Sequence, residues 1–365
     1  MKQTVRTSFV KQVGWCERMG SVLTAELVAA ALDDLDRGGP VSDIVAGYEG
    51  DAISDALPLR LMGGVHRLVL LGAAPGLARH YPTAGGTPDR ATLVEDFLAV
   101  VQDNAAYLRD ANLIPPQTNE IGRSATLLPG LAWALAGRDL RVRLLEIGSS
   151  AGLNLHLDRY VYRTDAWHRD GADDAPRIDV DWTGPAPVIP ERIDIADRLG
   201  CDRNPLDVAD PEARIRLLSF IWPDQVDRFR RLDAAARLVA SVGVTVAKAD
   251  ASAWVAARLA EPQPSGTMTV LQHSVMWMYL NQDERAAIES AVADAGATAT
   301  PERPFAHIRF ESSPEQYDAE GHRLTATVWP GGHSEVLAWG HAHGTWVRWV
   351  GTTRADGPKS HAADH

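Results

Sequence analysis

The stretch that decides the fold runs from residue 141 to residue 160, RVRLLEIGSSAGLNLHLDRY. Its first part, up to Ile147, is mostly apolar and short, which is typical of a buried strand. The chain then reaches Gly148, and apolar residues with helical spacing resume after Gly152, at Leu153 and Leu157. The stretch therefore predicts a strand, a tight glycine turn and a helix.

A turn of this kind can bind a ligand. In open α/β sheets, ligands bind beyond the carboxyl ends of the strands. A turn placed there directs backbone N–H groups and the positive end of a helix dipole toward the ligand. Gly148 permits a sharp turn, Gly152 permits close packing, and Glu146 offers an acceptor for an ammonium or hydroxyl group. A purely structural turn between a strand and a helix has the same pattern.

The sequence of the turn, residues 148–152, also fits a serine hydrolase. The spacing G-x-S-x-G is not the dinucleotide fingerprint G-x-G-x-x-G, but it matches the nucleophile elbow of hydrolases. Ser150 would then be the nucleophile, and Asp250 followed by His273 or His343 occurs in the required chain order. A serine hydrolase therefore remains an alternative.

The series Glu146-x-Gly148-x-Ser150-x-Gly152 resembles motif I of class I S-adenosylmethionine-dependent methyltransferases, whose usual form is E/D-x-G-x-G-x-G. The chain departs from that form at Ser150. Nearly the whole chain, including the segment QTNEIGRSA at 117–125, resembles a bacterial family of unknown function. The first resemblance implies an α/β fold with a Rossmann-like sheet, mostly parallel with an antiparallel C-terminal edge. It also implies S-adenosylmethionine as cofactor and a small-molecule substrate.

The resemblance assigns roles to acids that follow later strands. In the resembled enzymes, an acid after the second strand accepts from the ribose hydroxyls; Asp202 is the first choice for it and Asp181 is the alternative. An acid after the third strand accepts from the adenine amino group, and Asp250 fits that position. Each of these three acids could instead simply cap a helix.

Polar residues at the end of a fourth strand complete the candidate site. His273 follows Gln272 there and is the candidate general base, since an unperturbed histidine has a pKa of about 6.5. A lone histidine is more often structural. Asn119 and Glu120 precede the glycine-turn strand and are pocket candidates, with Thr118 as the expected cap of the next helix.

The predicted catalytic residues are His273, Glu120 and Asn119. The predicted cofactor-binding residues lie at strand ends, in the turn, or just before the first strand: Glu146, Gly148, Ser149, Ser150, Gly152, Asn154, Asp202, Asp250, Ala251, Gln272 and Arg123. A third possibility is a non-catalytic nucleotide- or metabolite-binding protein on the same fold.

Periodicity divides the chain into regions. Residues 1–136 carry helical apolar stripes and predict a helical N-terminal cap region. Residues 137–352 predict the α/β domain, with an inserted segment at about 161–195 and four strands near the end. Residues 353–365 form a polar tail that we expect to be disordered.

Composition excludes several classes. The 365 residues carry a net charge of −12 without a Lys or Arg run, so duplex nucleic acid is not an expected partner. No stretch approaches the roughly 20 apolar residues of a membrane span, so we expect a cytoplasmic protein without a membrane partner. The two cysteines, Cys16 and Cys201, indicate neither disulfides nor zinc, and no metal site is predicted. The acceptor and the oligomeric state are not indicated.

Overall fold

The computed structural model describes residues 2–312 and 321–352, and the chain divides into two compact units. The first unit comprises residues 1–118 and 210–233, and the second comprises residues 119–209 and 234–365. The first break lies before residue 136, because helix α8 (Ser124–Leu135) groups with the sheet. The predicted disordered tail at 353–365 lies outside the described residues.

The first unit is built from helices, as the sequence predicted. Helices α1 (Lys2–Arg18) and α2 (Val22–Arg37) pack together, and α4 (Leu57–Leu70) contacts α1, α7 and α9. The other elements, with η denoting 3-10 helices, are α3 (Pro40–Val45), α5 (Pro75–Ala78), η1 (Pro82–Ala84), α6 (Leu93–Asp103), α7 (Ala105–Ala111), α9 (Pro211–Ser219) and the start of α10 (Val226–Val242).

The glycine pair after α2 ends that helix. Gly38 has a φ of 72°, in the left-handed region that glycine adopts without strain. Its N–H donates to the carbonyl of Leu35, and the N–H of Gly39 donates to the carbonyl of Asp34. Because these bonds satisfy the last helical carbonyls, the chain can turn and start α3 at Pro40.

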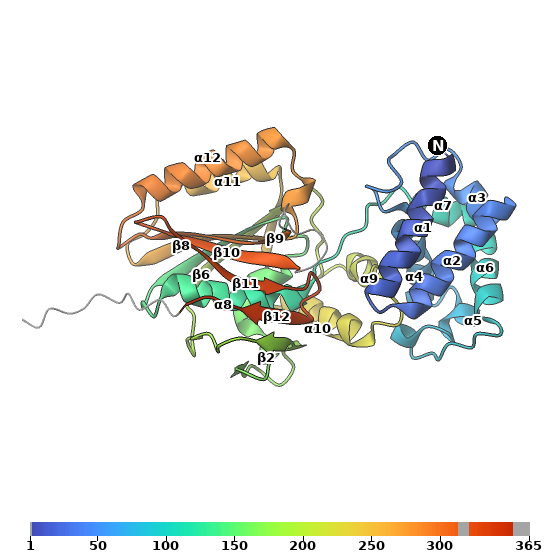
Figure 1. Ribbon diagram of the computed structural model, residues 1–365, viewed down its shortest axis with the longest axis horizontal. Coiled ribbons are helices and arrows are strands. Elements are labelled where there is room, and N and C mark those ends of the chain that lie inside the picture. The colour runs from blue at the N-terminus through green and yellow to red at the C-terminus, as the bar shows by residue number, and fades with distance from the viewer. Residues whose placement is uncertain (1, 313–320, 353–365) are drawn as a thin grey trace, which may run out of the picture. The chain divides into compact units, whose positions relative to one another are not determined.

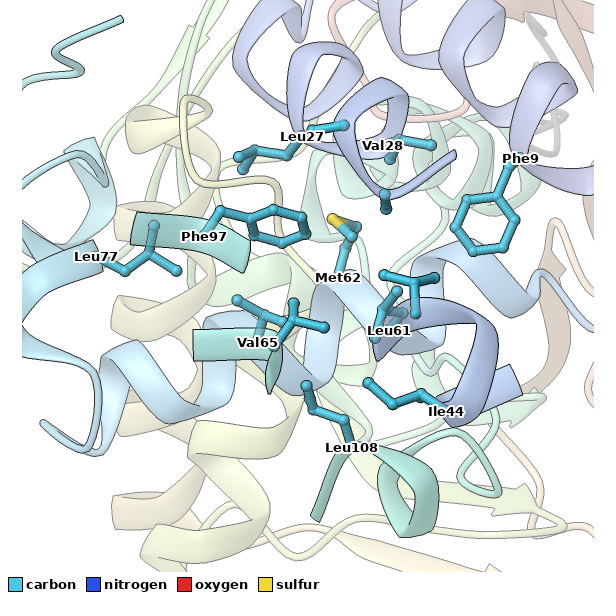
Figure 2. Packing of buried hydrophobic residues seen from close by; sticks show 14 of the residues in the cluster. Phe9, Leu27, Val28, Ile44, Leu61, Met62, Val65, Leu77, Phe97 and Leu108 are labelled. Carbon is cyan, nitrogen blue, oxygen red and sulfur yellow. The ribbon is translucent and has the colours of Figure 1, made fainter. Parts of the chain in front are cut away.

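Apolar side chains from several helices fill the centre of the first unit. Figure 2 shows Leu61, Met62 and Val65 of α4 together with Leu27 of α2 and Phe97 of α6. All five are buried. Burying a large apolar side chain contributes about 1.5–3 kcal/mol, so this cluster stabilises the helical unit.

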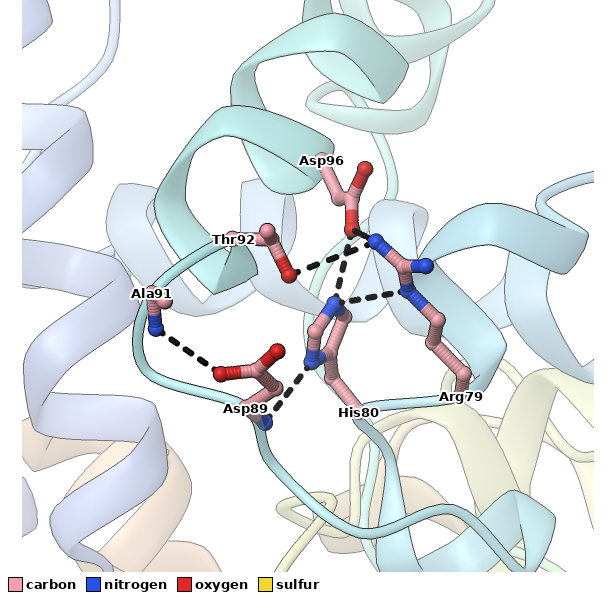
Figure 3. A network of polar contacts seen from close by, with 6 residues as sticks. All are labelled: Arg79, His80, Asp89, Ala91, Thr92 and Asp96. Atoms are coloured by element: carbon pink, nitrogen blue, oxygen red, sulfur yellow. Dashed lines mark hydrogen bonds and ion pairs between the residues drawn. The ribbon is translucent and has the colours of Figure 1, made fainter.

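A polar network around the buried His80 ring fixes the chain between α5 and α6 (Figure 3). The His80 ring is fully buried, and its Nδ1 accepts from the backbone N–H of Asp89 at 3.0 Å. Its Nε2 lies 2.7 Å from Asp96 Oδ2, which also accepts from Arg79. These hydrogen bonds, that of His80 first, lower the pKa of Asp96. Both ring nitrogens therefore have partners within the protein.

The second unit contains a nine-stranded sheet in the order β5-β12-β11-β10-β9-β8-β1-β6-β7. Its parallel part consists of β1 (Arg141–Ile147), β6 (Ile195–Asp202), β7 (Thr245–Lys248), β8 (Thr267–Ser274) and β9 (Phe305–Ser312). The chain runs through β1, β6 and β7 on one side and then crosses to β8 on the other. The strand order therefore switches direction between β1 and β8.

The C-terminal strands extend this sheet in antiparallel fashion. They are β10 (His322–Trp329), β11 (His333–Gly340) and β12 (Trp346–Trp349). The predicted fold class, a mostly parallel α/β sheet with an antiparallel C-terminal edge behind a helical region, is confirmed.

Helices cover both faces of the sheet (Figure 1). Leu145, Leu271 and Phe305 point to the face covered by α11 (Ala251–Leu259) and α12 (Gln282–Thr298), which lie side by side. Helix α8 covers the opposite face, where Gly130 approaches Ile308 so closely that an added Cβ would lie 3.3 Å from Ile308 Cγ2. Adjacent residues of one strand thus face different helices.

The segment after β1 forms a small second sheet. It contains β2 (Val161–Arg163), β3 (His168–Arg169) and β4 (Arg177–Asp179), in the order β3-β2-β4. The chain then continues into β5 (Asp181–Thr183), which pairs with β12 at the far edge of the main sheet. Asp181 therefore cannot be the acid that ends the strand beside β1. No helix within residues 2–312 and 321–352 is long and apolar enough to cross a membrane.

Candidate functional site

The carboxyl ends of the parallel strands gather most of the predicted residues at one edge of the sheet. Glu146 of β1 lies beside Gln272 of β8 in the strand register. Asp202 ends β6, the neighbour of β1 on the other side, and lies opposite Lys248 of β7 in the strand register. This edge lies at the switch in strand order, which is where open α/β sheets bind ligands.

The turn after β1 requires its glycines for two different reasons. Gly148 and Gly152 have φ angles of 63° and 71°. A Cβ on Gly152 would lie 2.9 Å from Val244 Cγ2, so this glycine allows close packing against the protein. Gly148 is exposed, although a Cβ there would lie 2.9 Å from Met276 Cβ. Ser150, with a φ of 54°, adopts the same left-handed region without being glycine, which costs backbone energy.

The predicted helix after the turn is wrong in type. The chain forms the 3-10 helix η3 (Leu153–Arg159), and His156 interrupts it with φ −107° and ψ 21°. A short interrupted 3-10 helix does not align peptide dipoles as an α-helix does. The expectation of a helix dipole directed at a ligand therefore fails.

Backbone N–H groups of the turn donate hydrogen bonds to side chains of the protein. Asn119 Oδ1 accepts from the N–H of Ala151 at 3.2 Å and from the N–H of Leu153 at 3.0 Å. The N–H of Ser150 donates to Asp202 Oδ2 at 2.9 Å. Asn119, a predicted catalytic residue, thus holds the turn in shape from the segment that precedes β1.

The rest of that segment fastens the turn further. Glu120 Oε1 accepts from the N–H of Gly122 and caps the 3-10 helix η2 (Ile121–Arg123). The N-cap of α8 is Arg123, without a side-chain cap, so the predicted capping role of Thr118 is wrong. Ser124 Oγ donates to Asn154 Oδ1 at 2.8 Å. Glu120 and Asn154, predicted as catalytic and cofactor-binding residues, are both buried in these contacts.

Arg123 connects the segment to two other parts of the second unit. Its Nη1 donates to the carbonyl of Ser274 at the end of β8, at 3.0 Å. Its Nε donates to the carbonyl of Ala342 in the turn between β11 and β12, at 2.8 Å. Arg123 therefore positions the β8 end and places a positive charge near Glu146.

Three buried polar atoms at the strand ends have no hydrogen-bond partner among the described residues. They are Glu146 Oε2, Gln272 Oε1 and Ser150 Oγ. Burial raises the pKa of Glu146 to about 8, although the Arg123 charge and a hydrogen bond from Gln272 act in the opposite direction. Buried polar groups are normally paired, and all three of these atoms are oxygens that can accept a hydrogen bond. The group that fits them is rich in N–H donors, such as an ammonium.

The two predicted acids are only partly used by the protein. Asp202 is half-buried, and its Oδ1 accepts from the N–H of Asn204 at 2.8 Å. Asp250 caps α11 by accepting from the N–H of Ser252 and Ala253. The hydrogen bond from the Ser252 hydroxyl is the largest of the effects that lower the pKa of Asp250 to about 2. The cap interpretation of Asp250 is confirmed, and its side chain is still 41% exposed.

Two other predicted cofactor-binding residues, Ser149 and Ala251, have side chains that point into the protein interior. Ser149 is fully buried, and its Oγ donates to the carbonyl of Cys201 at 3.2 Å. Ala251 begins α11 and packs in the apolar cluster between that helix and the sheet. Neither side chain lies at the edge with Glu146.

His273 lies on the other face of the sheet from Glu146 and Gln272. Its Nδ1 is 2.7 Å from Glu311 Oε1, its Nε2 is 3.1 Å from His307 Nε2, and its ring stacks on Trp277. The ring is fully buried. Because both nitrogens are engaged, His273 has no ring atom left to take a proton from a substrate.

Sequence reasoning missed Glu311 and His307. Glu311 also accepts from the N–H of Met276 and Trp277, so it fixes the turn that follows β8. Burial, more than the neighbouring charges, lowers the pKa of His307 well below its usual value. The sequence contained part of the information needed to find them, because residues 307, 309 and 311 alternate along one strand and therefore lie on one face of the sheet.

The serine hydrolase alternative finds little support. Ser150 Oγ has no hydrogen-bond partner among the described residues, so no histidine is placed to activate it. Within residues 2–312 and 321–352, no group of three or more His, Cys, Asp or Glu side chains is arranged to hold a metal ion.

Comparison with known proteins gives one finding. A family model described as "Uncharacterized protein conserved in bacteria (DUF2332)" matches residues 6–349. No curated protein matches the chain significantly, and no solved structure does.

Proposed function

The chain belongs to the DUF2332 family, and from the geometry of its second unit we propose that it is an S-adenosylmethionine-dependent methyltransferase acting on a small molecule. One observation carries the proposal. The glycine turn, the buried pair Glu146 and Gln272, and Asp202 all lie at the switch in strand order between β1 and its neighbours.

The residues at this edge fit the cofactor group by group. The buried oxygens of Glu146 and Gln272 suit the α-ammonium of the methionine part. Asp202 retains lone pairs for the ribose hydroxyls. Asp250 Oδ2 is not used by the helix cap and lies 3.6 Å from Arg203 Nη2, in an ion pair that is partly exposed. Gly148, which is exposed, allows a ligand to approach the backbone.

When bound, S-adenosylmethionine supplies an electrophilic methyl group on a sulfonium sulfur. The protein must then hold the acceptor atom in line with that group and exclude water, so orientation accounts for most of the rate increase. His273 does not serve as the base in this proposal, because both of its ring nitrogens have partners. The proposal therefore favours acceptors that carry a lone pair without prior deprotonation by His273.

Calorimetry with three ligands tests the proposal. S-adenosylmethionine and S-adenosylhomocysteine carry the ammonium, and 5′-methylthioadenosine lacks it. We expect the first two to bind more tightly than the third, and Glu146→Gln to remove most of that difference. Asp202→Asn should weaken all three ligands, because it reduces the charge that faces the ribose.

Asp181→Asn is the matched control. Asp181 is an acid at the far edge of the same sheet, so its substitution should leave all three affinities unchanged. Absence of binding by both ammonium-bearing ligands at millimolar concentration would refute the proposal. Binding without turnover across acceptor libraries would instead indicate the non-catalytic alternative.

A further inference from the structure

Two adjacent glycines bring three helices of the first unit close together. A Cβ on Gly63 of α4 would lie 2.6 Å from the Phe220 ring, which directly follows α9. A Cβ on Gly64 would lie 3.0 Å from Leu108 Cδ2 of α7. Helix α4 can therefore contact α7 and α9 at the same level.

One turn further along α4, Arg67 lies near Arg216 of α9 and Tyr107 of α7. Burial lowers the pKa of Arg216, and the positive charge of Arg67 lowers it further. Burial raises the pKa of Tyr107, against which Arg67 acts. Arg216 Nη2 lies 3.4 Å from Gln117 Oε1. Two positive charges and a phenol thus share one region of the helical unit.

These side chains carry more donors than their surroundings accept. The Nε atoms of Arg67 and Arg216 and the Tyr107 hydroxyl are buried atoms without a hydrogen-bond partner in the described part of the chain. Arg67 pairs with Glu212 at 2.6 Å, whereas Arg216 forms no ion pair with any described carboxylate.

Elsewhere in the same unit, an exposed arginine is paired with a carboxylate. Arg6 of α1 makes three hydrogen bonds to the carboxylate of Asp36. The chain contains 48 acidic and 36 basic residues, so carboxylates are not scarce. Holding two half-buried guanidinium groups together without a second carboxylate raises the energy of the protein. An added anion would remove that cost.

We propose that Arg67, Arg216 and Tyr107 form an anion-binding site for the carboxylate or phosphate group of a small molecule. The planar guanidinium matches both oxyanions with two parallel hydrogen bonds, and the phenol adds a third donor. The site belongs to the first unit and does not depend on the function proposed for the second.

The test measures anion binding to the full chain by calorimetry and by thermal unfolding. The probes are inorganic phosphate and acetate, with sodium chloride at the same ionic strength as reference. We expect one of the two anions to raise the Tm above the chloride reference. The identity of the stronger probe decides between phosphate and carboxylate as the recognised group.

Three variants locate the binding. Arg216→Gln should weaken the preferred anion by at least about tenfold, since it removes a charged hydrogen-bonding group. Tyr107→Phe, which only removes a hydroxyl, should weaken it by about threefold. Arg6→Gln is the control and should leave the affinity unchanged. Equal anion binding by Arg216→Gln and the unsubstituted protein, or stabilisation by chloride to the same extent, would overturn the proposal.

Discussion

The strand ends of the second unit and the arginine cluster of the first unit both contain buried polar atoms without hydrogen-bond partners. The atoms at the strand ends are acceptors, and those in the arginine cluster are donors. At the strand ends, oxygen atoms of Glu146 and Gln272 are buried without a donor. In the cluster, N–H groups of Arg67 and Arg216 are buried without an acceptor. Native proteins pair nearly all buried polar groups, so each deficit supports the ligand that we propose for that region, and its sign matches the charge of that ligand.

The network around His80 shows what a satisfied cluster looks like. Both of its ring nitrogens have partners, and its carboxylate accepts from two neighbours (Figure 3). Such a network stabilises the fold and leaves nothing for a ligand to supply. Comparing the three clusters separates binding from structure, and four measurements can break or sharpen that comparison.

The largest expected effect is the pH dependence of stability at Glu146. The folded pKa of about 8 lies above the ordinary value of 4.5, so the contribution is fully present below pH 4.5 and is lost as pH rises through 8. Relative to Glu146→Gln, the free energy of unfolding of the unsubstituted protein should fall by up to about 5 kcal/mol over this window. Denaturant unfolding at several pH values measures the difference. Parallel curves for the two proteins would show that Glu146 ionises normally.

The next effect is the pH dependence of ligand affinity. An ammonium binds the ionised carboxylate of Glu146, which becomes more abundant as pH rises toward 8. The affinity for S-adenosylhomocysteine should therefore increase by up to about tenfold per pH unit between pH 6 and 8. Calorimetry in two buffers of different ionisation enthalpy counts the released proton. Glu146→Gln should abolish both the slope and the release, and an unchanged slope would separate Glu146 from the ligand.

Removing the His80 ring tests the satisfied network. His80→Ala removes the acceptor of the Asp89 N–H and leaves the Asp96 carboxylate with Arg79 alone, which should cost about 2 kcal/mol of unfolding free energy. Affinities for phosphate, acetate and S-adenosylhomocysteine should stay constant. A loss of affinity larger than the experimental error would assign the network to a binding site.

The smallest effect concerns Arg216 without a ligand. Arg216→Gln removes repulsion from Arg67, so the ligand-free protein should gain about 0.5 kcal/mol of stability. Thermal unfolding in a buffer without phosphate or carboxylate measures it. Destabilisation by Arg216→Gln would show that Arg216 is held by favourable contacts within the protein.

Sequence patterns predicted much of the fold because they report local periodicity. The strand at 141–147 and the four C-terminal strands all appear in the structure. Parallel strands end on the same side of a sheet, so Glu146, Asp202 and Gln272 could be placed at one edge. These predictions needed no knowledge of tertiary partners.

The remaining features depend on contacts between distant residues. The choice between Asp202 and Asp181 required the strand pairing, which places Asp181 at the far edge of the sheet. The donors of the glycine turn are satisfied by Asn119, whose position relative to the turn no local pattern reveals. Arg67 and Arg216 meet only because α4 and α9 pack together. Tertiary pairing decides which polar groups remain available, and a single sequence does not contain it.

The contact between Gly148 and Met276 has a consequence for the evolution of the family. Even one extra carbon at position 148 would lie within 2.9 Å of Met276 Cβ, and the left-handed backbone disfavours it further. The two positions should therefore covary. Homologues that replace the glycine should carry glycine at 276 or a differently shaped loop after β8, and an alignment of DUF2332 sequences would reveal that pairing.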